Sequence, residues 1–183
     1  MMIIKQFQTI TKNDVEIAGG KGASLGEMIK AGIPVPAGFV LLSTAFEIFL
    51  EQTDLNVEIE TILGNVNINK IHTIEEASEK IRTLITNRYI PDSISAIILD
   101  EFKKLGHPFV AVRSSATSED SATAAWAGQL ETYLNTTEKT LLENVKRCWA
   151  SLFTPRAIFY RFEQKLDKEK ISVAVVIQKM INS

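Results

Sequence analysis

Two positively charged side chains stand where a phosphate group could bind. Lys21 lies within the run Gly19-Gly20-Lys21-Gly22, just before a stretch of helical character. Glycines let the backbone approach a ligand closely and a helix N-terminus favours anions, so this run is a candidate phosphate site. It is not a Walker A loop, because Val15 replaces the first glycine of that motif and Gly22 replaces the Ser or Thr after its lysine. A turn with a solvent-exposed lysine is the alternative interpretation.

The second cation is Arg113, which ends the apolar run 109–112 and precedes hydroxyl side chains at positions 114, 115 and 117. A strand of this kind buries the arginine stem and projects the guanidinium beyond the sheet edge, where its planar fork can bind two phosphate oxygens. An ion pair with Glu119 or Asp120, which lie close in sequence, is an equally good interpretation. The chemistry open to this arginine is therefore anion binding, with a structural ion pair as the alternative.

A loop could cover such a ligand. The small-residue segment 114–128 is longer than an ordinary hairpin turn, and loops of this length inside compact domains are usually functional or disordered. Gly128 and Gln129, followed by Thr132, fit a flap that folds over a ligand. Trp126 either anchors this flap or belongs to the core, and the core is the simpler interpretation.

The apolar run near the C-terminus ends in Gln178, Met180 and Ile181. An adenine ring needs an apolar slot together with main-chain donors and acceptors, and the end of a strand supplies both. An ordinary core strand has the same pattern, so the local sequence favours a structural role for these residues.

The composition excludes several other classes of protein. The chain has 22 Asp+Glu against 20 Lys+Arg, and this balance argues against a general nucleic-acid binder or a polybasic membrane binder. No apolar run approaches the roughly 18 residues of a membrane span. The single cysteine, Cys148, allows no internal disulfide and suits the reducing cytoplasm. His72 and His107 are isolated, so no metal site is predicted in this chain.

The elements that must position these residues follow from hydrophobic periodicity. Two sub-lobes are expected, a mostly helical one over 1–106 and one of strands plus helices over 107–183. The predicted fold class is α+β, with a mixed sheet and flanking helices. Expected strands cover 3–9, 39–42, 109–113, 130–134 and 172–179, and expected helices cover 23–31, 44–53, 73–88, 91–105, 138–152 and 155–160.

Local signals mark the ends of the helices. Thr44 and Thr73 each precede a glutamate by three positions, which is a capping-box pattern, and Thr154 precedes a proline suited to the first turn. Gly32 and Gly106 fit helix C-termini. The residues expected in the core are Val110, Val112, Leu141, Val145, Trp149, Val173 and Val175.

These motifs occur together in one known family. The sequence resembles the start of phosphoenolpyruvate synthases (pyruvate, water dikinases), and the matching blocks keep the family's order over nearly the whole chain. The family shares an ATP-grasp-like nucleotide-binding domain with pyruvate phosphate dikinases and with rifampin phosphotransferases, which are the nearest alternative. The blocks are GGKGASLGEM (19–28), GIPVPAGF (32–39), VAVRSSATSED (110–120), AGQLETYLN (127–135), CWASLFTPRAI (148–158) and VIQKM (176–180).

The resemblance implies an ATP site between two subdomains. By motif position, Lys21 and Arg113 would bind the phosphates and take part in catalysis. The loop over the phosphates would contain Gly128, Gln129 and Thr132. The residues near the adenine would be Gln178, Met180 and Ile181. In the family, ATP gives its β-phosphoryl group to a histidine on a separate swivelling domain. A third domain then passes the group to pyruvate, or to rifampin in the alternative, and the synthase yields phosphoenolpyruvate, AMP and phosphate.

Some parts of the family pattern have no counterpart in this sequence. The acidic Mg²⁺ ligands of the second ATP-grasp lobe and the carrier-histidine motif are missing, and the segment 121–126 replaces the usual one that contains leucine and proline. Residues 1–183 are therefore expected to be the first lobe of the ATP-binding domain of a larger enzyme, inactive alone, with phosphohistidine and pyruvate-binding domains as partners. A free-standing, non-catalytic nucleotide-binding module is the remaining alternative.

Overall fold

The computed structural model describes residues 2–117, 131–165 and 172–181. Its strands are β1 (Ile4–Gln6), β2 (Gly38–Leu41), β3 (Val110–Ala116), β4 (Thr132–Thr136) and β5 (Val173–Lys179). Its α-helices are α1 (Val15–Lys30), α2 (Ser43–Gln52), α3 (Leu55–Gly64), α4 (Ile71–Asn87), α5 (Asp92–Lys104), α7 (Glu138–Ala150) and α8 (Pro155–Glu163). Short 3₁₀ helices are η1 (Phe7–Thr9), η2 (Lys12–Asp14) and η3 (Ser151–Phe153).

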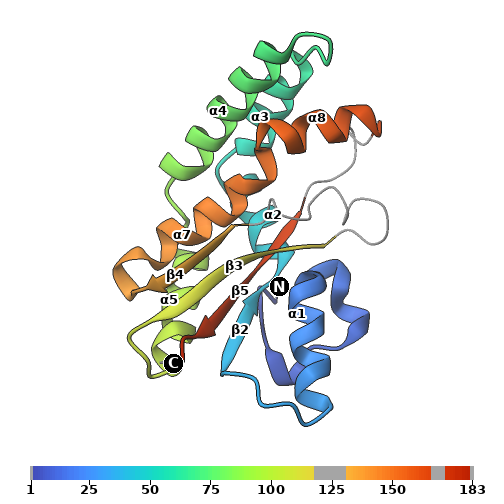
Figure 1. Ribbon diagram of the computed structural model, residues 1–183. Coiled ribbons are helices and arrows are strands. Elements are labelled where there is room, and N and C mark those ends of the chain that lie inside the picture. The colour runs from blue at the N-terminus through green and yellow to red at the C-terminus, as the bar shows by residue number, and fades with distance from the viewer. Residues whose placement is uncertain (1, 118–130, 166–171, 182–183) are drawn as a thin grey trace.

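The strands form one sheet in the order β1-β2-β5-β3-β4, shown in Figure 1. The α+β class is confirmed, but one detail of the prediction is wrong: the sheet is not mixed, because all of its described pairings are antiparallel. β5 lies between β2 and β3, so Val40 and Arg113 both lie opposite Val176. The sheet therefore draws strands from both of the stretches 1–106 and 107–183.

The two faces of the sheet carry different side chains, since successive residues of a strand point to opposite faces. Phe39 and Val175 face the main core, which α2 and α7 also enter. Val40 and Val176 face α1 and belong to a smaller apolar cluster with Ala18. In Figure 1, α1 lies beside the sheet on its own, while α4, α8 and α3 extend beyond α7.

The core prediction is confirmed in full. The seven residues expected there, Val110, Val112, Leu141, Val145, Trp149, Val173 and Val175, are all completely buried. Trp149 packs on two phenylalanines of α2, with ring centroids 5.5 Å from Phe46 and 4.8 Å from Phe49. Aromatic contacts of this kind add to the stabilisation from burial and fix α7 against α2.

Several helix ends follow their local signals. Gly32 adopts a φ of +76° after α1 and Gly106 a φ of +61° after α5, as glycines at C-termini do. The Thr154 hydroxyl accepts a hydrogen bond from the Ala157 amide and so caps α8. These three predictions are confirmed, and the proline at the first turn of α8 is also in place.

Other predictions at the helix ends are wrong. Thr44 and Thr73 lie inside the first turns of α2 and α4 and cap neither helix, because each helix begins before its threonine. Instead, the Thr44 hydroxyl donates to the carbonyl of Met2, and the Thr73 hydroxyl donates to that of Lys70. The helix α3 was not predicted. In the part of the chain that the structure describes, no helix is long and apolar enough to cross a bilayer.

Candidate functional site

The helix α1 is broken at Gly19, which has φ +69° and ψ 168°. A Cβ atom on this residue would lie 2.6 Å from the Ser115 carbonyl oxygen, 2.7 Å from that of Ala116, and in overlap with the Ser115 hydroxyl. Only glycine accepts both this conformation and this close approach. The main part of α1 therefore starts at Gly20, against the end of β3, and not at residue 23 as predicted.

The N-terminus of this part of α1 is capped by a side chain of strand β3. The Ser115 hydroxyl accepts hydrogen bonds from the amides of Lys21 (3.1 Å) and Gly22 (3.4 Å). A helix ordinarily receives such a bond from its own N-cap residue, whereas Ser115 lies 94 positions further along the chain than Lys21. The cap joins α1 to β3 and fixes the position of the Lys21 backbone, from which the lysine side chain extends.

The Lys21 side chain is half-buried, and its Nζ donates to the main-chain carbonyl of Ser114 at 2.7 Å. This bond holds the ammonium next to the strand position of Arg113. Burial lowers the pKa of Lys21, and the positive charge of Arg113 lowers it further. Two like charges thus lie close together with incomplete solvation, an arrangement that a bound anion would stabilise.

Arg113 has an unsatisfied donor. Its Nε is buried and has no hydrogen-bond partner among the described residues. Within those residues, neither Arg113 nor Lys21 forms an ion pair with a carboxylate. The carboxylates considered as its partners, Glu119 and Asp120, lie outside the described residues. A buried arginine donor without a partner, with the Lys21 ammonium close by, fits the oxygens of a phosphate group.

Strand register brings other predicted residues onto the same face as Arg113. Thr132 of β4 lies directly opposite Arg113, and Gln178 of β5 lies opposite Ala111, two positions away on β3. Directly opposed residues share a face, so Arg113, Thr132 and Gln178 all lie on the face that α1 covers in part. Thr132 is exposed there.

The residues predicted near an adenine gather at the other end of β3. The Gln178 amide group donates to the Pro36 carbonyl (3.3 Å), and the Met180 amide donates to the Phe109 carbonyl (3.3 Å). Ile181 is 70% exposed just beyond the strand. Register places Lys179 opposite Val110, three positions before Arg113, which is about 10 Å along the strand. This separation suits an elongated ligand with one anionic end.

Two predicted site residues, Gly128 and Gln129, lie outside the described residues, as does Trp126. Sequence reasoning also missed a part of the site. It noted Ser114 and Ser115 as hydroxyl side chains after Arg113, whereas the structure uses the Ser114 carbonyl and the Ser115 hydroxyl to hold Lys21. No local signal marks this role, because the residues are joined only by the tertiary fold.

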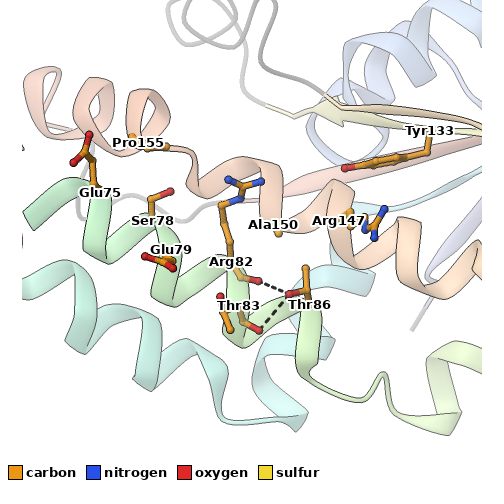
Figure 2. Close-up of a pocket in the computed structure, with 10 residues that line it drawn as sticks. All are labelled: Glu75, Ser78, Glu79, Arg82, Thr83, Thr86, Tyr133, Arg147, Ala150 and Pro155. Atoms are coloured by element: carbon orange, nitrogen blue, oxygen red, sulfur yellow. Dashed lines mark hydrogen bonds between the residues drawn. The ribbon is translucent and has the colours of Figure 1, made fainter. Parts of the chain in front are cut away.

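A separate groove lies on the other face of the sheet, between α4 and α7 (Figure 2). It has a volume of about 520 Å³ and contains none of the predicted site residues. Arg82 extends from α4 toward α7, and Tyr133 reaches the groove from β4, next to Thr132. Adjacent residues of β4 thus point to opposite faces, and the groove is distinct from the face that carries Arg113.

The described residues do not fit a Mg²⁺ site. Across residues 2–117, 131–165 and 172–181, no group of three or more His, Cys, Asp or Glu side chains could hold a metal ion. Mg²⁺ requires oxygen ligands such as carboxylates, and the polar groups beside Lys21 are hydroxyls and main-chain carbonyls engaged in hydrogen bonds within the protein.

With the fold and site in place, comparison with known proteins settles the class. The chain belongs to the family of the pyruvate phosphate dikinase AMP/ATP-binding domain, whose model matches residues 15–183. This match covers Lys21, Arg113 and every other residue of the face described above.

Among curated relatives, the chain is 41% identical over 184 residues to a protein named probable phosphoenolpyruvate synthase from Methanothermobacter thermautotrophicus. It is 44% identical over 189 residues to the phosphoenolpyruvate synthase of Aeropyrum pernix and 38% identical over 219 residues to that of Pyrococcus furiosus. These alignments cover 97%, 99% and 98% of this chain but only 27%, 23% and 27% of the relatives. The chain thus spans about a quarter of the length of each.

Proposed function

We propose that this chain is the first lobe of the ATP-binding domain of a phosphoenolpyruvate synthase. The observation that carries the proposal is the pair of cations on one sheet face, Lys21 and Arg113, of which the second has a buried Nε without a described partner. The names of the relatives favour pyruvate over rifampin as the final acceptor. We further propose a cytoplasmic location, in keeping with the buried, unpaired Cys148.

In this proposal the chain contributes positioning and charge. Phosphoryl transfer depends mainly on orienting the phosphates and on neutralising the charge that develops on their oxygens. The Arg113 guanidinium binds two phosphate oxygens, and the Lys21 ammonium approaches a third from α1. We assign Thr132, together with Gly128 and Gln129, to the loop over the phosphates. Gln178, Met180 and Ile181 line the adenine end.

The remaining chemistry belongs to parts of the full-length enzyme. ATP donates its β-phosphoryl group to a carrier histidine on another domain, which leaves AMP, and water takes the γ-phosphoryl group, which leaves phosphate. The histidine then passes its phosphoryl group to pyruvate. Mg²⁺ supplies charge neutralisation when bound, with ligands that we assign to the second lobe. We therefore expect the 183-residue chain alone to bind ATP weakly and to show no turnover of ATP with pyruvate.

Calorimetric titration of the chain with ATP tests the proposal. Arg113→Ala and Lys21→Ala should each weaken binding about tenfold or more, because each removes a charge-assisted contact to phosphate. Arg82→Ala is the matched control, since this arginine lines the groove on the opposite face and should leave the affinity unchanged. Unchanged affinity in both Arg113→Ala and Lys21→Ala would refute the site, and a loss confined to Arg82→Ala would move it to the groove.

A further inference from the structure

The contacts of Lys21 depend on two adjacent serines of β3 that act in different ways. Ser114 offers its main-chain carbonyl to the Lys21 Nζ, a contact that any residue at this position would provide. Ser115 offers its side-chain hydroxyl to the Lys21 and Gly22 amides, a contact that needs a hydroxyl. The direction in which Lys21 leaves α1 therefore depends on the identity of residue 115.

Ser115 is fully buried, Gly22 is buried and Lys21 is half-buried. Without its hydroxyl, two helix N-terminal amides would lose their acceptor next to a glycine that is already in a left-handed conformation. Unpaired buried amides are costly, so the first turn would shift or fray to reach water. The Lys21 ammonium would then leave the carbonyl that holds it beside Arg113.

Resting on the proposed function, we propose that Ser115 is a positioning residue for ATP binding. Its hydroxyl caps α1 at Lys21 and so keeps the lysine ammonium at the phosphate end of the site, next to Arg113, without touching the nucleotide itself. This role goes beyond the phosphate contacts proposed above, because it makes the position of Lys21 on α1 depend on a side chain of β3, 94 positions further along the chain.

The strand itself provides a matched control. Ser114 is the same residue type, is equally buried, and donates its hydroxyl to the Glu131 carbonyl at 3.3 Å. Its side chain points to the opposite face from that of Ser115. Ser114→Ala therefore removes one buried hydroxyl from β3 while it leaves both the main-chain carbonyl for Lys21 and the cap on α1 in place.

The test compares Ser115→Ala with Ser114→Ala in the 183-residue chain by calorimetry with ATP and by NMR titration of the Lys21 side chain. Ser115→Ala should weaken ATP binding about fivefold and move the lysine pKa back toward its ordinary value, as the ammonium becomes more solvated. Ser114→Ala should change neither. Thermal unfolding of both variants shows that they are folded.

The outcomes separate this inference from the proposed function. If the wild-type chain binds ATP and Arg113→Ala weakens binding, but Ser115→Ala behaves as the wild type, the positioning role is wrong and the site stands. Equal losses in Ser115→Ala and Ser114→Ala would also overturn it, since the effect would be one of general stability. If the wild-type chain binds no ATP, the proposed function fails, and the Lys21 titration alone decides whether Ser115 positions the lysine.

Discussion

Gly19 passes so close to Ser115 that a β-carbon on the glycine would lie 2.6 Å from the serine's carbonyl oxygen. Gly19→Ala should therefore lower the free energy of unfolding by about 2–4 kcal/mol. The alanine would have to adopt a positive φ, and its β-carbon would overlap with backbone atoms of β3. Chemical denaturation monitored by tryptophan fluorescence measures the change.

The neighbouring glycine is the control for this prediction. Gly20 is helical, and a β-carbon there would meet nothing within 4 Å. Gly20→Ala should keep or raise stability, by up to about 1 kcal/mol, because alanine favours a helix. A similar loss of stability in both variants would mean that the contact with Ser115 is not the cause.

Arg113 should favour binding at some cost to stability. Arg113→Met removes a buried donor without a described partner and a positive charge close to Lys21. We expect the melting temperature to stay the same or to rise, with a gain of up to about 1 kcal/mol, while ATP binding is lost. Parallel calorimetry and thermal melts check this; a large fall in melting temperature would show that Arg113 is structural.

The pKa of Lys21 predicts a pH dependence. Burial and Arg113 hold this pKa below the ordinary 10.5, so the ammonium loses its proton earlier than an exposed lysine as the pH rises. Because the lowered pKa reflects a charge that is unfavourable in the folded state, its destabilising effect disappears as the pH approaches 10.5. ATP affinity should fall over the same alkaline range, as the positive charge is lost.

Titrations with ATP between about pH 7 and about pH 10 measure that fall. Lys21→Arg is the control, since an arginine stays charged throughout and its affinity should remain flat with pH. The same decline in the wild type and in Lys21→Arg would assign the pH dependence to another group.

The N-terminal cap of α8 lies far from the candidate site and allows a prediction about stability alone. The Thr154 hydroxyl accepts a hydrogen bond from the Ala157 amide at 3.3 Å, so Thr154→Ala should destabilise the chain by about 1 kcal/mol. Thr154→Ser retains the hydroxyl and should restore most of this loss. Urea denaturation measures both variants, and ATP affinity should be unchanged because α8 lies beyond α7, away from β3.

Elements that depend on local signals were predicted well from the sequence. The start of α8 needs only Thr154 and the proline after it, and the ends of α1 and α5 need only Gly32 and Gly106. Helix α3 was not predicted, because it follows Asp54 in a left-handed conformation and has no side-chain cap. The patterns at Thr44 and Thr73 gave wrong caps, because α2 begins at Ser43 and α4 at Ile71, upstream of each threonine and without a side-chain cap.

The site was predicted as separate residues, and its assembly was not. Lys21 and Arg113 were chosen one by one from residue type and resemblance to a family. What joins them is the contact of Gly19 with Ser115 and the register of β3 with β4 and β5, which link positions far apart in the chain. Local patterns carry no information about such pairings, so the serine that caps α1 could not be assigned from sequence.

The place of β5 in the sheet has a consequence for biosynthesis. β5 comes after the other described strands in the sequence, yet it pairs with β2 on one side and with β3 on the other. While a ribosome still holds residues 173–179, β2 and β3 lack their shared neighbour and leave apolar edges open. The sheet therefore closes only near the end of synthesis of this segment, and a nascent chain stalled earlier should be bound by chaperones.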